Sequence, residues 1–165
     1  MDFKQDILPL KNIMFRTALR IVINREEAED IVQECLVKIW MLVQDGESIN
    51  NLESYALTIT RNLALDRKAL AVNRVMSLDD TIYDQEDEQQ SPEQMLIQDE
   101  NTSIIMQLVN ALPEKQRTIM QLRDIEGKAY KEIAEILNIS ESDVKVSLFR
   151  ARKQIKEDYL KMGIL

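Results

Sequence analysis

One segment of the 165-residue chain divides it into two parts. Residues 75–100 contain nine acidic residues and no basic one. Like charges at this density repel one another, and the few apolar residues cannot offset the entropy of ordering the chain, so a flexible, extended linker is predicted. The sequence therefore indicates two small domains, residues 1–74 and residues 101–165, joined by an acidic linker. Ser91 and Pro92 are placed to start the next helix near residue 92.

Both domains are predicted to be helical. The chain has only three glycines and three prolines, which is too few for the turns between many short strands. Good helix-forming residues dominate its composition, and its apolar residues recur at helical spacing. The expected fold class is all-α: two small helical domains joined by a flexible acidic linker, the C-terminal one containing a helix-turn-helix.

The N-terminal domain is predicted to be a bundle of three helices. The first spans residues 3–23. Asn24 caps the second, because an acidic residue follows three positions later, and this helix ends near Gly46. The third begins after Asn50, again with an acid three positions on, and its apolar face runs as far as Leu70.

The acidity of the chain is local. The formal net charge is −8, of which the linker contributes −9 because it holds nine acids and no base. The rest of the chain therefore carries +1, so the folded domains can still present basic faces to nucleic acid.

The residue types that the chain lacks exclude several classes of chemistry. It has no histidine, the commonest general base and metal ligand, and only one cysteine, Cys35. We therefore expect no catalytic residue, no metal and no cofactor. A single cysteine forms no internal disulfide, no apolar run reaches the roughly 20 residues that span a bilayer, and the N-terminus lacks a signal-peptide layout. These features suit a cytoplasmic protein without membrane insertion.

Residues 130–154 are predicted to form two short helices joined by a turn. Asn138 tolerates the left-handed backbone of a sharp bend, and Ser140 followed by Asp143 has capping-box spacing. In the second helix, apolar residues recur every three or four positions from Val144 onward and form the core side. An amphipathic helix with a merely solvated basic side is the alternative. The opposite side is predicted to bind DNA, and it carries Lys145, Ser147, Phe149, Arg150, Arg152 and Lys153.

A second basic stretch ends the N-terminal domain. Arg61, Arg67 and Lys68 have the charge to pair with phosphates. Asn62 has donor and acceptor atoms that can read a base edge. The competing interpretation is a solvated helix end, where the helix dipole favours lysine and arginine. The stretch by itself leaves both interpretations open.

Several motifs resemble those of bacterial RNA polymerase sigma factors. Residues 28–34 (AEDIVQE) with Ile39-Trp40 resemble the polymerase-binding helix of these factors, and residues 61–67 resemble the helix that follows it. Their order and spacing are similar to the small extracytoplasmic-function (ECF) class, over nearly the whole chain except the linker. The C-terminal residues that carry the resemblance are Leu112-Pro113-Glu114, Arg117, Leu122-Arg123, Glu126-Gly127, Tyr130–Ala134 and Phe149–Arg152.

The resemblance implies what each domain does. The N-terminal domain would dock on a coiled coil of the polymerase clamp, and would capture a flipped base of the melted minus-ten element with the loop 46–52 and Asn62. The C-terminal domain would bind the polymerase flap and read the minus-thirty-five duplex, with Arg123 at a phosphate-contacting position. The implied partners are core RNA polymerase, promoter DNA and an anti-sigma factor that occludes these faces. The residues implied in polymerase binding are Asp30, Gln33 and Glu34.

The helix expected to read DNA departs from the family pattern. Asp143, Lys145 and Ser147 stand where many relatives have threonine and arginine, and the Asp143 carboxylate would repel a nearby phosphate unless it serves mainly as a cap.

Two other functions fit the sequence less well. A stand-alone helix-turn-helix regulator would bind a palindromic operator as a dimer, but residues 28–34 speak against it. A recombinase needs a positioned serine or tyrosine nucleophile with clustered arginines, and the sequence shows no such cluster.

Overall fold

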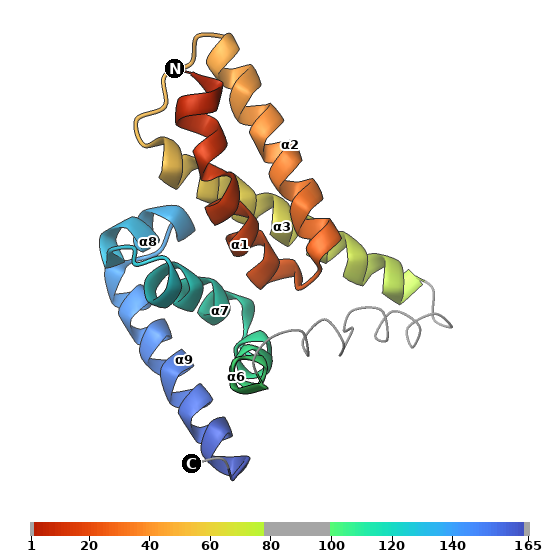
Figure 1. Cartoon of the computed structure of the whole chain (residues 1–165), viewed down its shortest axis with the longest axis vertical. Helices are drawn as coiled ribbons and strands as arrows, with labels where there is room; N and C mark the ends of the chain where they lie inside the picture. Colours follow the sequence, from red (N-terminus) through yellow and green to blue (C-terminus); the bar gives the residue numbers. More distant parts are fainter. Residues whose placement is uncertain (1, 78–99, 164–165) are drawn as a thin grey trace.

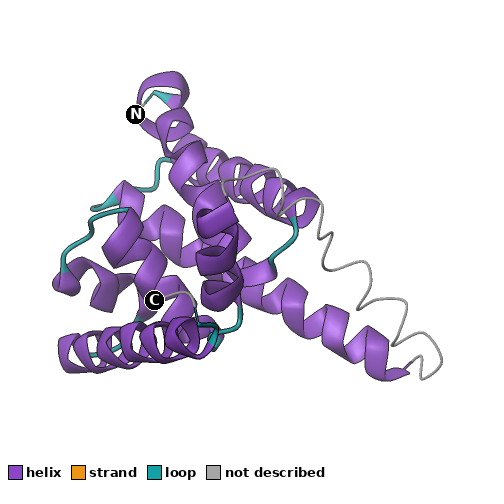
Figure 2. Cartoon of the chain, turned by 60° about the horizontal axis from the view of Figure 1, so that its bottom comes forward, coloured by secondary structure: helices purple, strands orange, loops and turns teal. Residues whose placement is uncertain are grey.

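The computed structural model describes residues 2–77 and 100–163, with the side chains of residues 2–74 and 104–163. Every regular element in these ranges is helical (Figure 2), which confirms the all-α prediction. Most of the predicted linker, including Ser91 and Pro92, lies outside the described residues. Within them, no helix combines the length and the apolar character that crossing a membrane requires.

Three long helices form the N-terminal domain. A π-helical turn (Phe3–Ile7) and a 3-10 turn (Leu8–Leu10) lead into α1 (Lys11–Val22). The second and third helices are α2 (Arg25–Gln44) and α3 (Leu52–Ser77). The three pack on one another through fully buried apolar side chains, which include Met14, Ile21, Ile31, Ile39 and Leu57.

In this domain one predicted cap is confirmed, another lies one residue later than predicted, and one predicted core residue is exposed. The Asn24 side chain caps α2 by accepting from the Glu27 N–H at 2.9 Å, as predicted. Asn51, not Asn50, caps α3, because its Oδ1 accepts from the Ser54 N–H at 3.1 Å. Leu70 was wrongly expected in the core: it is 61% exposed, because the last turns of α3 project beyond α1 and α2 (Figure 1).

Four helices form the C-terminal domain. They are α6 (Glu100–Asn110), α7 (Glu114–Met120), α8 (Tyr130–Leu137) and α9 (Glu141–Lys161). A π-helical turn (Gln121–Ile125) extends α7.

The predicted helix-turn-helix is confirmed at α8 and α9. Asn138 takes the left-handed conformation, with φ of 57°, and so ends α8 in a sharp bend. The Ser140 hydroxyl oxygen accepts from the Asp143 N–H at 3.0 Å and thereby starts α9. Ile133, Val144 and Leu148 are fully or almost fully buried between the two helices.

The two domains lie against each other. Helix α1 contacts α7, and α3 contacts α8 (Figure 1). The polar contacts across this boundary bear on function and are described below.

Candidate nucleic-acid interface

The first turns of α9 present a basic surface that includes a large aromatic side chain. Lys145, Arg150 and Lys153 are exposed, and the Phe149 ring among them is 68% exposed. Cations on such a helix can pair with phosphates, and an apolar ring in the major groove can contact a thymine methyl group. This surface matches what a recognition helix needs.

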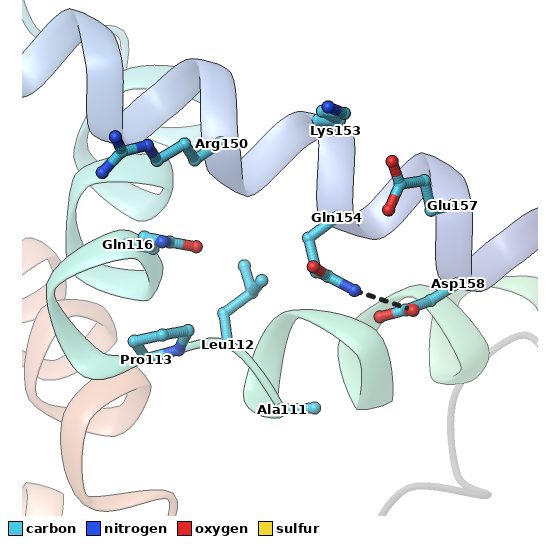
Figure 3. Close-up of a pocket in the computed structure, with 9 residues that line it drawn as sticks. All are labelled: Ala111, Leu112, Pro113, Gln116, Arg150, Lys153, Gln154, Glu157 and Asp158. Atoms are coloured by element: carbon cyan, nitrogen blue, oxygen red, sulfur yellow. Dashed lines mark hydrogen bonds between the residues drawn. The ribbon is translucent and has the colours of Figure 1, made fainter.

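A groove of about 520 Å³ borders this surface (Figure 3). Arg150 and Lys153 line its α9 wall together with Glu157 and Asp158, opposite the connection between α6 and α7. Gln154 donates to Asp158 at 2.9 Å. Because the two carboxylates would repel phosphate, the predicted DNA-binding surface of α9 should end before Glu157. The remaining lining residues are Ala111, Leu112, Pro113 and Gln116.

Ser147 does not lie on the exposed side of α9, where the sequence interpretation placed it. Its side chain is buried, with 7% exposure, and its hydroxyl donates to Asp143 Oδ1 at 3.1 Å. The physical reason is its spacing of three residues from buried Val144 and four from buried Ala151, which puts it on the same helical stripe. This spacing from two apolar residues was a signal in the sequence that Ser147 is buried, although its side chain is polar.

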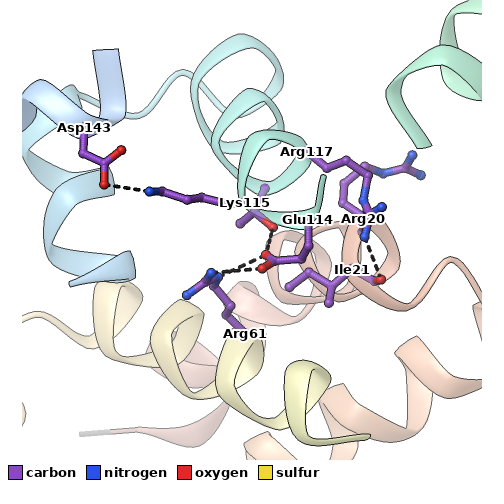
Figure 4. Close-up of polar contacts among 8 residues, drawn as sticks. Arg20, Ile21, Arg61, Glu114, Lys115, Arg117 and Asp143 are labelled. Carbon is purple, nitrogen blue, oxygen red and sulfur yellow. Dashed lines mark hydrogen bonds and ion pairs between the residues drawn. The ribbon is translucent and has the colours of Figure 1, made fainter. Parts of the chain in front are cut away.

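The negative charge of Asp143 is neutralised within the domain. Lys115 donates to its Oδ2 at 2.6 Å (Figure 4), and this hydrogen bond, with that of Ser147, holds the pKa of the carboxyl below its usual range. Asp143 therefore acts as an internal partner near the start of α9, and its repulsion of a DNA phosphate is offset by the ammonium group beside it.

Two other predicted DNA contacts have partners inside the domain. Arg152 forms a bidentate ion pair with Asp124. Arg123 donates to the Lys128 carbonyl oxygen at 2.9 Å, and its guanidinium carbon lies 4.3 Å from the centroid of the Tyr130 ring. The Lys145 ammonium lies 5.5 Å from the same ring. Tyr130 thus brings Arg123 and Lys145 together, a role that the sequence interpretation missed although Tyr130 belongs to a quoted motif.

In the N-terminal domain, one arginine holds three carboxylates. Arg67 on α3 donates to Glu27 at 3.2 Å, to Asp30 at 2.5 Å and to Glu34 at 2.7 Å, all on α2. The hydrogen bond with Asp30 contributes most to raising the pKa of the Arg67 guanidinium, and those with Glu34 and Glu27 add to it. The structure therefore joins a residue predicted to bind DNA to two residues predicted to bind polymerase. Gln33 is exposed on the same helix.

The other residues of the basic stretch in the N-terminal domain differ in their exposure to solvent. Lys68 and Asn62 are exposed, and Asn62 lines a cavity of about 160 Å³ together with Glu34 and Cys35. Burial raises the pKa of the Cys35 thiol, so this group is not a ready nucleophile. Arg61 is half-buried and forms an ion pair with Glu114 of the C-terminal domain.

Comparison with known proteins identifies both domains. Residues 8–71 match the family Sigma-70 region 2, and residues 102–155 match Sigma-70, region 4. The chain belongs to the sigma-70 family of RNA polymerase sigma factors. The curated relatives place this sigma factor in the ECF class, and the presence of both regions, in this order, favours that function over a stand-alone operator-binding regulator.

Relatives of this sigma factor match over most of its length. It is 28% identical to the RNA polymerase sigma-H factor of Pseudomonas aeruginosa, over 91% of this chain and 83% of that protein. It is 26% identical to the ECF RNA polymerase sigma factor SigX of Bacillus subtilis, over 87% of this chain and 76% of that protein.

A solved structure has the same fold. It is the sigma factor RpoE of Bartonella quintana in complex with the anti-sigma factor NepR. It matches with a TM-score of 0.70 at 23% identity, over 94% of this chain and 95% of that one.

Proposed function

We propose that region 2 binds core RNA polymerase and the melted minus-ten element, and that region 4 reads the minus-thirty-five duplex. Region 2 corresponds to residues 1–74 and region 4 to residues 101–165, with residues 75–100 as the linker. The sigma factor acts by binding alone: it performs no covalent chemistry and needs no cofactor. Its place of action is the cytoplasm, where polymerase and promoter meet.

One observation carries the region-4 assignment. On α9, the cations Lys145, Arg150 and Lys153 surround the exposed Phe149 ring, directly after the bend of a helix-turn-helix. Such a helix can enter the major groove, pair with phosphates and place Phe149 against base edges. Arg123 and Arg152 lie beside this surface with internal partners, and we assign them to positioning and to the edge of the contact. Ser147 is buried and is therefore not proposed as a DNA contact.

Charge distribution supports the region-2 assignment. Asp30, Gln33 and Glu34 line the exposed side of α2, and Arg67 holds the two carboxylates in place. A fixed acidic surface suits a protein partner better than DNA, because it repels phosphate. Asn62 faces the small cavity beside Glu34 and is the proposed reader of the flipped base. Lys68 is a further phosphate contact in this assignment.

An anti-sigma factor is a further proposed partner. The Bartonella quintana neighbour was solved in complex with one, and a second structure with 18% identity shows CnrH with the cytosolic domain of CnrY. A partner of this kind would cover the polymerase- and DNA-binding faces.

Transcription in vitro with purified core polymerase tests the proposal. The sigma factor should bind core and direct initiation from a subset of promoters. Asn62→Ala should impair promoter opening more than binding of the upstream duplex, because unstacking a base costs a few kcal/mol that its pocket must offset. Open-complex formation is measured by permanganate reactivity of unpaired thymines. Unchanged opening by the variant would remove Asn62 from the pocket, and absence of core binding would refute the sigma function itself.

A further inference from the structure

The exposed side of α9 has an apolar centre that the sequence pattern did not single out. Val146 is 46% exposed and Phe149 is 68% exposed. At about 100° of rotation per residue, the two side chains lie only about 60° apart around the helix axis. The opposite side of the helix packs into the core, because Val144, Leu148 and Ala151 are buried. Val146 and Phe149, the apolar pair, therefore share the side of α9 that faces away from the core.

A cation stands on each side of the apolar pair. By the same helical rotation, the order around the axis is Lys145, Phe149, Val146 and Arg150, over an arc of about 140°. Lys145 and Arg150 are both exposed, and Arg150 projects from α9 at the edge of the groove (Figure 3). A helix in the major groove has a phosphate backbone on either side of it. This order therefore directs the cations towards the phosphates and the apolar pair towards the base edges.

Polar side chains beside the apolar pair have partners within the domain. Both carboxylate oxygens of Asp143 accept hydrogen bonds, from Lys115 at 2.6 Å and from Ser147 at 3.1 Å. Arg152 donates twice to Asp124. In the major groove, a carboxylate can accept from the amino group of cytosine and a guanidinium can donate to guanine. Because these groups already have partners, the centre of the exposed side is left to the apolar pair.

The edges of DNA bases offer one apolar group in the major groove. Thymine presents a C5-methyl group there, whereas a polar base edge that faced the apolar pair would lose its hydrogen bonds with water. Three residues advance a helix by about 4.5 Å, which is close to the roughly 3.4 Å between stacked base pairs. Val146 and Phe149 are therefore spaced to cover the methyl groups of two neighbouring thymines.

We propose that Val146 and Phe149 together select two neighbouring thymines in the duplex that α9 reads. Val146 is then a specificity-determining residue that acts by methyl contact rather than by hydrogen bonding. The proposal rests on the proposed function, because it names bases that region 4 recognises in the minus-thirty-five element. A protein is the alternative occupant of an exposed apolar surface, but cations on both sides of the apolar pair favour a polyanion.

Promoter selection by the complete sigma factor with purified core polymerase gives the first result. The templates are randomised at both elements, and the sequences of those that yield transcripts are compared. Active templates should share a pair of adjacent thymines on one strand of the upstream element. With Val146→Ser, the preference for one of these thymines should be lost, because a serine hydroxyl can bond to the edge of any base.

A matched control shows that the change in preference belongs to α9. Val72→Ser makes the same substitution at a position of α3 that is 51% exposed. It should select the same two thymines as the wild type. Circular dichroism should show unchanged helix content for both variants, because each replaced side chain is exposed.

Uracil substitution in a selected promoter isolates the methyl group. Uracil pairs as thymine does and lacks only the C5-methyl group. For the wild type and Val72→Ser, each uracil should weaken promoter binding about fourfold, as expected from the loss of one buried methyl group. With Val146→Ser, the penalty should disappear at one position and persist at the other, and Phe149→Ala should show the reverse. Competition between thymine and uracil duplexes for the holoenzyme measures these ratios.

The possible failures separate this proposal from the sigma function. Active templates without adjacent thymines, or equal binding of uracil and thymine, overturn the proposal. Equal uracil penalties for the wild type and Val146→Ser overturn it too, because Val146 is then not in the contact. If Val146→Ser weakens core binding and leaves base preference unchanged, the apolar pair binds polymerase and not DNA. Absence of initiation from every template would refute the sigma function itself, whereas initiation from templates that lack the thymine pair overturns this proposal alone.

Discussion

Two arginines of region 2 and three cations of region 4 look alike in sequence and differ in the structure. In region 2, Arg61 and Arg67 are held by carboxylates. In region 4, Lys145, Arg150 and Lys153 lie exposed on α9. The difference teaches that a basic cluster on a helix has two physical uses. It either organises the protein's own acidic groups or remains available to a phosphate.

The largest expected effect comes from the most heavily paired cation. Arg67→Ala leaves Glu27, Asp30 and Glu34 facing one another without compensation, so we expect region 2 to lose about 2 kcal/mol of unfolding free energy and core binding to weaken. Urea denaturation and core affinity measure the two effects. Arg67→Lys keeps the positive charge but lacks the planar guanidinium that bonds several carboxylates at once. It should therefore recover only part of the stability and part of the core affinity. If Arg67→Ala kept normal stability and core affinity and lost only DNA binding, Arg67 would be a phosphate contact and not an organiser of the acidic side chains.

A smaller effect is expected from an exposed cation of α9. Arg150→Ala should weaken binding to the minus-thirty-five duplex about tenfold, equivalent to about 1.4 kcal/mol, and should lower the salt dependence because one phosphate contact is lost. Fluorescence anisotropy with labelled duplex at several salt concentrations measures both. Thermal unfolding and core affinity should not change, because Arg150 is exposed. Equal loss of stability and DNA binding would show instead that Arg150 supports the fold.

The smallest expected effect is a pH dependence of the contact between the regions, caused by Glu126. The hydrogen bond from Arg16, supported by that from Gln121, holds the pKa of Glu126 below its usual range despite burial. A lowered pKa means that this carboxylate stabilises the contact between the two regions above the ordinary glutamate pKa of about 4.3. The stabilisation is lost as the pH falls through the lower, folded-state pKa. The radius of gyration should therefore rise on acidification below about pH 4.

A second acid provides the control for this titration. Asp143 also has a lowered pKa, but its partner Lys115 belongs to the same region. Glu126→Gln should flatten the pH dependence of the radius of gyration, and Asp143→Asn should leave it in place. The opposite pattern would mean that acid opening begins within region 4 rather than at the contact between the regions.

Much of the candidate site could be predicted from local patterns. Residues 28–34 and the α8–α9 motif are short sequences, and their resemblance to sigma-factor motifs in the same order indicated the family. Asn138 and Ser140 performed their predicted roles because a left-handed bend and a helix cap involve neighbours within four residues. Placement on a helical face was less certain, as buried Ser147 shows.

The chain alone determined the helices, their main caps and the helix-turn-helix, because each depends on interactions between residues close in sequence. Only the tertiary structure decided which cations are available to a ligand. Arg67 meets carboxylates at least 33 positions away, and Arg61 meets Glu114 across 53 positions. Such pairs depend on how whole helices and regions pack, and neither partner carries a local signal of the other. Arg117 shows this most clearly, because its partners on α1 are backbone carbonyls, which every residue possesses.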